Sequence, residues 1–273
     1  MPSINTISTD MLARLIGTPH CPALIDVRTD DDFNANPRLI PSSMRRPHAD
    51  PSGWAQEFAG SSAIVICHKG AKLSQGVAAW LRHAGVPADG LEDGFEGWRK
   101  ANLPTVPTAK MPPLDKERRT VWVTRARPKV DRIACPWLIR RFVDPRAVFL
   151  FVAPAEVEAV AERFAATPFD VEGVFWSHRG ETCTFDVMVE EFGLASNPML
   201  RLAAIVRGAD TGRFEVAPQA AGLLAASLGL SRMYADDLAQ LEAGLTLYDA
   251  FYRWCRDATD ETHTWHSAKK PGT

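Results

Sequence analysis

Residues 63–74, AIVICHKGAKLS, join a short apolar run to a cysteine and a loop that contains glycine and two lysines. The run at 63–66 is typical of a buried strand. After the loop, apolar residues recur with helical spacing at Val77, Trp80, Leu81 and Ala84, which predicts a helix that packs on the core through these residues. A second buried strand is expected at 23–27, ALIDV. Strands and helices that alternate in this way predict a parallel sheet covered by helices.

Cys67 stands where the strand of this stretch ends and the loop begins. The amides of a loop that leads into a helix can face an anion, and the helix start adds positive partial charge. Lys69 and Lys72 add full positive charges. Because each effect favours a thiolate, we predict that Cys67 is a nucleophile. The alternative is a cysteine that packs as a small apolar residue at the strand end.

Three motifs, in this order, resemble the rhodanese family over about residues 5–107. They are LIDVR at 24–28 with Phe33, CHKG at 67–70, and DGFEGW at 93–98 followed by Leu103-Pro104. The resemblance implies an α/β domain with a central parallel sheet and a sulfurtransferase activity that requires no cofactor. Cys67 would take sulfane sulfur from a small donor such as thiosulfate, carry it as a persulfide and pass it to a thiol acceptor. By the same resemblance Asp26 and Arg28 support the site, and the loop that cradles the persulfide consists of His68, Lys69, Gly70, Ala71, Lys72 and Leu73.

The chain departs from the family pattern in the length of this loop. Ser74 lies one position further from the cysteine than in common sulfurtransferases, so the loop from Cys67 to Leu73 has seven residues instead of six. Longer loops in the wider superfamily accompany phosphatases and arsenate reductases, which end the loop with an arginine that grips the oxyanion. This chain has Leu73 there, which disfavours phosphatase chemistry and leaves binding of another oxyanion as a variant. The usual GHIPGA stretch is also replaced, by RLIPSS at 38–43.

A proline-rich segment, LPTVPTAKMPPL at 103–114, separates the two halves of the chain and reads as a stiff linker. We therefore predict a rhodanese-like domain at 1–107, a linker at 108–117 and a second domain at 118–273. The second domain is expected to be mainly helical, of the α+β class, with strands at 120–124 and 148–152. Its helices are expected at 136–143, 155–166, 184–192, 198–208, 217–228 and 234–256.

Residues 131–145, DRIACPWLIRRFVDP, form the densest motif of the second half. Since proline is tolerated only in a first helical turn, the helix is expected to begin near Cys135. That position beside Arg132 would lower the pKa of the Cys135 thiol, although an inert cysteine is the alternative. Arg140 and Arg141 either lie in solvent or join Arg132 in holding an anion.

This stretch resembles the C-terminal domain of ChrB-type chromate-resistance proteins over about residues 118–257. The resemblance also rests on FD at 169–170, SHRGETCTF at 177–185, IVRGAD at 205–210 and LYDA at 247–250. It implies a role in chromate response or resistance. A candidate site for an oxyanion or a metal then consists of Arg132, Cys135, Arg140, Arg141, His178, Cys183 and Asp210.

His178 and Cys183 are the candidate metal ligands within that set, with Glu181, Asp186 and Asp210 as further donors. Imidazole, thiolate and carboxylate groups suit zinc or iron. The spacing of these residues matches no standard metal motif, however. A hydrogen-bonded core pair of His178 and Cys183 is the alternative.

Composition narrows the function classes. A hydrophobic content of 46% excludes a disordered chain, and 31 basic against 33 acidic residues argues against binding nucleic acid through bulk charge. The charges are nevertheless uneven, with a net +7 at 110–146 and −8 at 147–273, which indicates either an anion site or a docking face. The sequence shows neither a signal peptide nor an apolar run long enough for a bilayer, and its five cysteines are widely spaced. A cytoplasmic protein without a membrane partner is expected.

These observations favour a sulfurtransferase that acts through Cys67 and is coupled to a chromate-resistance domain. The first alternative is a chromate-responsive sensor or regulator without enzymatic activity. The second is direct redox handling of chromate by the thiol of Cys67 or Cys135.

Overall fold

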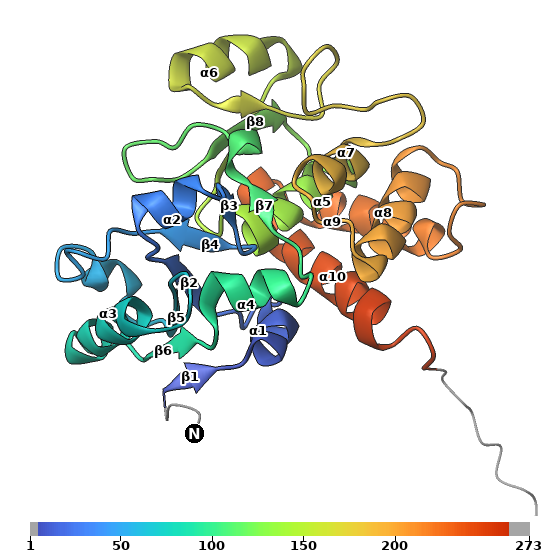
Figure 1. The fold of residues 1–273 in the computed structure, drawn as a ribbon. Coiled ribbons are helices and arrows are strands. Elements are labelled where there is room, and N and C mark those ends of the chain that lie inside the picture. Colours follow the sequence, from blue (N-terminus) through green and yellow to red (C-terminus); the bar gives the residue numbers. More distant parts are fainter. Residues whose placement is uncertain (1–4, 262–273) are drawn as a thin grey trace, which may run out of the picture.

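The computed structural model describes residues 5–261 (Figure 1). The N-terminal half contains a five-stranded parallel sheet in the order β1-β6-β5-β2-β4. The strands are β1 (Thr6–Ile7), β2 (Ala23–Asp26), β4 (Ser43–Arg45), β5 (Ala63–Ile66) and β6 (Ala88–Leu91). All four residues of the central strand β5 are buried. Since parallel strands end at one edge of the sheet, Cys67 emerges at the middle of that edge, where α/β proteins bind their ligands.

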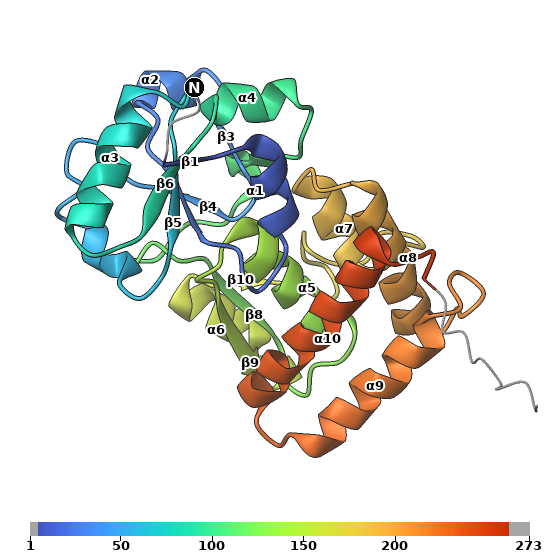
Figure 2. The ribbon, with the colours of Figure 1, turned by 90° about the horizontal axis from the view of Figure 1, so that it is seen from below.

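Helices cover both faces of this sheet (Figure 2). They are α1 (Thr9–Leu15), α2 (Asp30–Asn34), α3 (Lys72–His83) and α4 (Gly94–Lys100), with a 3₁₀ turn at Ala55–Phe58. Alternate strand residues face opposite sides: Ile64 belongs to the cluster that holds α1 and α4, and Val65 to the cluster that holds α3. The predicted helix after the loop is confirmed, but Trp80 is 53% exposed, so its assignment to the core was wrong. Ala78 occupies the buried face in its place.

The C-terminal half is mainly helical. A small parallel sheet in the order β10-β8-β9 consists of β8 (Val121–Arg125), β9 (Val148–Val152) and β10 (Thr167–Pro168). The helices are α5 (Asp131–Leu138), α6 (Val157–Phe164), α7 (Thr184–Glu191), α8 (Asn197–Asp210), α9 (Ala220–Met233) and α10 (Asp237–Asp257), and short 3₁₀ or π turns lie at Thr108–Lys110, Ile139–Val143 and Pro154–Glu156. The expected fold class, a parallel α/β domain followed by a mainly helical one, is confirmed. Within residues 5–261, no helix has the length and apolar character required to cross a membrane.

The two halves pack against each other through one continuous apolar cluster. The halves approach closely at Gly17, where an added Cβ would lie 2.4 Å from Cζ of Phe142. Next to it the backbone N–H of Ser42 donates to the carbonyl of Phe142 at 2.6 Å. The linker takes part as well, because the hydroxyl of Thr108 donates to the carbonyl of Pro37 at 2.7 Å and Lys110 pairs with Glu191 at 2.7 Å. Just before the linker, β7 (Val106–Pro107) pairs with β3 (Arg38–Leu39) within the N-terminal half. The segment between the halves is thus built into the structure over part of its length.

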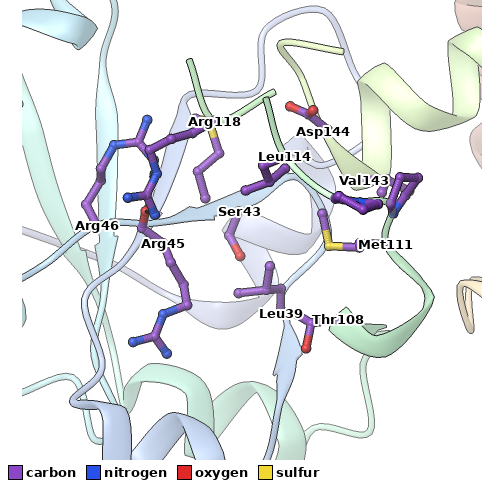
Figure 3. Close-up of a pocket in the computed structure, with 13 residues that line it drawn as sticks. Leu39, Ser43, Arg45, Arg46, Thr108, Met111, Leu114, Arg118, Val143 and Asp144 are labelled. Carbon is purple, nitrogen blue, oxygen red and sulfur yellow. Dashed lines mark hydrogen bonds between the residues drawn. The ribbon is translucent and has the colours of Figure 1, made fainter. Parts of the chain in front are cut away.

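A cavity of about 350 Å³ lies between the first domain, the linker and the second domain (Figure 3). Arg45 and Arg46 line it from the first domain, Met111 and Leu114 from the linker, and Asp144 from the second domain. Two of its three arginines pair with carboxylates, Arg45 with one of α2 and Arg46 with one in the 3₁₀ turn. The third, Arg118, donates to the carbonyl of Arg45 at 3.1 Å. The cavity is therefore part of the domain contact.

Candidate functional site

Cys67 lies at the bottom of a loop that leads into α3. Its side chain is buried, and its thiol donates to Oγ of Ser74 at 3.2 Å. Ser74 in turn donates to the carbonyl of Ala71 at 3.0 Å, which ties the thiol to the start of the helix. Within the described chain, the backbone N–H groups of His68, Lys69, Gly70 and Ala71 have no hydrogen-bond acceptor. Four unpaired donors that follow the thiol directly are the chemistry that holds an anionic sulfur species.

The loop keeps its shape through two glycines that approach each other closely. Gly70 and Gly94 both have positive φ angles, 65° and 54°. A Cβ at Gly94 would lie 2.2 Å from the carbonyl oxygen of Cys67, and one at Gly70 would lie 2.5 Å from the carbonyl oxygen of Leu91. The first turn of α4 also donates to the loop, from the N–H of Phe95 to the carbonyl of Cys67 at 2.9 Å. Only glycine permits this approach, which explains the DGF motif.

Asp26 and Arg28 lie beneath the loop region as a buried ion pair. Nε and Nη2 of Arg28 donate to Oδ2 of Asp26 at 2.8 and 2.6 Å, and both side chains are almost fully buried. The guanidinium group also lies 3.7 Å from the ring centroid of Phe95. The pair thus links the end of β2 to Phe95 of α4, whose backbone N–H donates to the carbonyl of Cys67. It makes no hydrogen bond with the thiol among the described residues.

A second polar cluster lies in the C-terminal half, around His178. Its Nε2 atom lies 3.5 Å from Oδ2 of Asp131, 3.4 Å from Oδ1 of Asp170 and 3.3 Å from Oδ2 of Asp210. Asp131 is the first residue of α5, and Asp170 follows β10. His178 lies in the loop before α7, and Asp210 is the last residue of α8. We call them the His178 cluster. Asp131 and Asp170 are buried, whereas the histidine side chain is 42% exposed.

The start of α7 holds two of the carboxylates in place. The N–H of Thr184 donates to Oδ2 of Asp131 at 2.6 Å, and its hydroxyl donates to Oδ1 of Asp170 at 3.0 Å. Arg125 and Arg132 take the other oxygen of Asp170, at 3.1 and 3.4 Å. Both carboxylates are therefore oriented by fixed donors.

The pKa values of the His178 cluster are shifted because three carboxylates lie close together around the histidine. Burial raises the pKa of Asp131, despite its contact with His178. Burial and the charges of Asp131 and Asp170 raise the pKa of Asp210 to about 7. Interaction with the Asp131 carboxylate and the charges of the other two raise the pKa of His178 to about 9. Three carboxylates close together disfavour their own ionisation and favour a cation among them.

The prediction that the helix of residues 131–145 begins near Cys135 is wrong. Helix α5 begins at Asp131, and Pro136 lies inside it, followed by a π turn at Ile139–Val143. Cys135 is completely buried, and burial together with the charges of nearby aspartates raises the pKa of its thiol well above 9. The expected lowering is wrong because desolvation and carboxylates outweigh the helix start.

Arg140 and Arg141 do not join the His178 cluster. Arg140 pairs with Glu242, and Arg141 pairs with Asp249 of α10 at 2.8 Å. Both line a cavity of about 490 Å³ beside the N-terminal half, yet their charges are already compensated. Most other members of the basic segment 110–146 are also paired, largely with acids of the C-terminal half: Lys110 with Glu191, Arg125 and Arg132 with Asp170, and Arg127 with Asp237. The uneven charge distribution thus reflects internal pairing.

Cys183 caps α7 and does not contact His178 in any recorded interaction of the described residues. Burial raises the pKa of its thiol far above 9. Asp186 accepts from the N–H of Cys183 at 3.0 Å and pairs with Arg207 at 2.8 Å, while Glu181 is exposed and pairs with Arg213. Of the predicted metal donors, the structure therefore brings only His178 and Asp210 together, and Arg132 joins them through Asp170.

The sequence reading missed Asp131 and Asp170 as members of the cluster. Both stood inside the quoted motifs, at 131–145 and 169–170. An aspartate at each of these element ends was the available signal, since polar side chains at the ends of packed elements often meet at a site. Their separation by 39 positions along the chain hid the fact that both lie next to His178.

The comparisons with known proteins agree with this division. Residues 8–101 match the family model of the rhodanese-like domain, and residues 122–255 match that of the ChrB C-terminal domain. Protein ChrB of Cupriavidus metallidurans is 36% identical over 132 residues, which are 48% of this chain and 39% of that protein.

Two solved structures are similar to the N-terminal part. SSP1007 of Staphylococcus saprophyticus is 24% identical, covers 35% of this chain and 93% of its own, and has a TM-score of 0.32. A thiosulfate sulfurtransferase from Pseudomonas aeruginosa is 23% identical, covers 38% of this chain and 19% of its own, and has a TM-score of 0.34. From the two family matches it follows that the chain joins a rhodanese-like domain, at residues 8–101, to a ChrB C-terminal domain, at residues 122–255.

Proposed function

We propose that this protein is a sulfurtransferase in which Cys67 accepts sulfane sulfur, and that it serves chromate resistance in the cytoplasm. The observation that carries the proposal is the set of unpaired N–H groups from His68 to Ala71 next to a buried thiol. Such donors stabilise a negative charge on sulfur where it develops. Lys69 and Lys72 are exposed beside them and attract an anionic donor.

The proposed reaction with thiosulfate has two steps. The Cys67 thiolate attacks the sulfane sulfur of the donor, a bond forms between the two sulfur atoms, and sulfite leaves with the electron pair of the bond that breaks. A thiolate acceptor, or cyanide in an assay, then attacks the outer sulfur of the persulfide and releases the Cys67 thiolate. The loop amides hold the negative charge in both steps, and no cofactor takes part.

The loop has no group of the kind that phosphatases use to hold an oxyanion. Leu73 ends the loop, and the lysines carry no planar fork for bidentate binding. The internal pairing of the basic segment 110–146 gives no support to a nucleic-acid partner. The burial of Cys135 weakens the alternative in which that thiol reduces chromate, because it disfavours the thiolate.

The test is thiocyanate formation from thiosulfate and cyanide, with the mass of the Cys67 peptide measured after thiosulfate alone. We expect the wild type to gain one sulfur atom at Cys67, and the Cys67→Ser variant to lose activity by at least about 1000-fold. The matched control is Cys21→Ser, which removes the other cysteine of the same domain and should leave the activity unchanged. A Cys67→Ser variant as active as the wild type would overturn the proposal.

A further inference from the structure

We propose that the His178 cluster binds a divalent transition-metal cation through His178, Asp131, Asp170 and Asp210. Nε2 of the histidine lies within 3.3 to 3.5 Å of one oxygen from each of the three carboxylates. The candidate donor atoms of His178, Asp131 and Asp170 all lie within 4.8 Å of one another. Donors from four separate segments thus converge on one point, as metal ligands do.

A carboxylate oxygen of Asp131 without a hydrogen-bond donor in the described chain supports the binding of a cation. Oδ1 of Asp131 is buried and has no hydrogen-bond partner in the described chain, although Oδ2 accepts from Thr184. A buried carboxylate oxygen without a partner is costly, and native proteins satisfy such atoms with a donor, a water molecule or an ion. A cation bound at Oδ1 of Asp131 supplies that partner, and His178 lies 3.5 Å from Oδ2 of the same carboxylate.

The surrounding residues resemble the outer shell of a metal site. Thr184 donates to Asp131 and Asp170, and Arg125 and Arg132 hold the oxygen of Asp170 that faces away from the histidine. Donors of this kind fix the orientation of ligating carboxylates. The two arginines offset part of the negative charge of the three aspartates. The negative charge that remains favours a divalent cation.

The identity of the donors selects the class of metal. Carboxylate oxygens with one imidazole suit Mn²⁺, Fe²⁺ or Zn²⁺. Cys183 caps α7 and its thiol interacts with the Asp131 carboxylate, but it is not among the donor atoms that lie within 4.8 Å of one another. The cluster therefore lacks the set of thiolates that favours Cu⁺. An all-oxygen magnesium or calcium site is disfavoured by the central imidazole.

A cation can reach the site from solvent. His178 is 42% exposed, and it lines an open cavity of about 530 Å³ together with Asp170, Arg125 and the loop at 171–174. Asp131 does not line this cavity and lies buried behind His178, with a side chain 1% exposed. The arrangement has a buried anchor and an open side, where water completes the coordination.

The experiment measures metal content and affinity of the full chain, independently of sulfur transfer. The protein is stripped with a chelator and dialysed separately against Zn²⁺, Mn²⁺ and, without oxygen, Fe²⁺; bound metal is then measured by mass spectrometry and titration calorimetry. We expect about one equivalent of at least one of these ions. At 100 times the Kd, the metal should raise the Tm by about 5–10 °C.

Two ligand variants are chosen for partial exposure, so that folding survives: His178→Ala and Asp210→Asn. Each should weaken metal binding on the order of 100-fold. The matched control is Glu181→Gln, an exposed acid in the same region that pairs with Arg213, and it should bind like the wild type. Circular dichroism and the thermal unfolding transition without metal report whether each variant is folded.

The possible results separate this inference from the proposed function. Cys67→Ser should bind metal like the wild type, so the loss of one proposal leaves the other standing. If the wild type binds less than about a tenth of an equivalent of each of the three ions, the metal site is overturned. The His178 cluster is then an internal group of charges without a metal. Equal binding by wild type, His178→Ala and Asp210→Asn overturns it as well, because the metal would then lie elsewhere.

Discussion

The Cys67 loop and the His178 cluster prefer charges of opposite sign for opposite structural reasons. At the loop, the free groups are backbone N–H donors, and the nearby acid Asp26 is neutralised by Arg28. At the cluster, the free groups are carboxylate oxygens, and the available donors are already engaged with Asp170 and Asp131. On the two proposals above, the loop accepts an anion and the cluster a cation.

The comparison teaches that a helix start does not decide the charge of a site by itself. The sequence predicts a helix N-terminus next to both Cys67 and Cys135, where positive partial charge favours an anion. Cys67 precedes α3 and has lysines beside it. Cys135 lies within α5 among buried aspartates, which raise the pKa of its thiol. The groups that surround the helix end determine which ion is favoured.

Among the variants that distinguish the two sites, Gly94→Ala is expected to have the largest effect, on sulfur transfer. It tests whether the function of the Cys67 loop depends on the shape of its backbone. The new Cβ would lie 2.2 Å from the carbonyl oxygen of Cys67 at a φ of 54°, so the loop must move. We expect sulfur transfer to fall by about 100-fold while metal binding at the His178 cluster persists, because misplaced donors lose most of their effect. Steady-state thiocyanate kinetics measure the change.

The control for this variant is Gly76→Ala within α3. No atom lies within 4 Å of the added Cβ there, and alanine favours a helix by about 1 kcal/mol over glycine. Activity should stay at the wild-type level. Retention of full activity in Gly94→Ala would show that the amides of the loop do not hold the sulfur.

The two sites also differ in how much of each could be predicted from the sequence. The Cys67 loop is contiguous, so the strand, the cysteine and Gly70 are visible in twelve residues. The cluster is assembled from residues 131, 170, 178 and 210, and its contacts depend on how α5, α7 and α8 pack. The sequence indicated His178 and Asp210 as donors, but it grouped them with Arg140 and Arg141, which α10 holds elsewhere.

The position at which a helix begins was also hard to predict from the sequence. Proline rules placed the start of α5 near Cys135, whereas tertiary packing begins the helix at Asp131 and tolerates Pro136 inside it. The loss of one backbone hydrogen bond is offset by burial of Ile133, Trp137 and Leu138 in the core. In this case the apolar cluster, which the local sequence does not reveal, outweighs the propensity of a single residue.

The next largest effect is expected from Arg28→Met, on the free energy of unfolding. This variant tests whether the Asp26–Arg28 ion pair stabilises the fold, unlike the charges of the His178 cluster. Removal of the guanidinium leaves the Asp26 carboxylate buried without its partner and also removes the contact with Phe95. We expect the free energy of unfolding of the N-terminal domain to fall by about 3–5 kcal/mol. Urea denaturation followed by tryptophan fluorescence measures it.

Its control is Lys100→Met, which removes the exposed pair between Lys100 and Glu96 of α4. Exposed pairs of this kind contribute less than about 0.5 kcal/mol. If Arg28→Met cost no more than Lys100→Met, the buried pair would not support the loop, and the contrast between a neutralised and an unneutralised site would lose its basis.

The smallest effect concerns the remaining thiols and their dependence on pH. Burial raises the pKa of Cys21 to about 11, although Ser42 and Arg141 favour its thiolate. Since the thiolate is the reactive form, alkylation of Cys21 in the Cys67→Ser variant should rise about tenfold per pH unit and level off near pH 11. Cys135 and Cys183 should stay unlabelled, because burial keeps their pKa higher still. Mass spectrometry of iodoacetamide-labelled peptides from the folded protein follows each cysteine.

In the wild type, the same experiment at pH 8 should label Cys67 before the other four cysteines, because its loop offers unpaired donors to a developing negative charge. Labelling of Cys135 ahead of Cys21 at that pH would contradict the argument. It would mean that the surroundings of Cys135 within α5 favour its thiolate in spite of the Asp131 carboxylate.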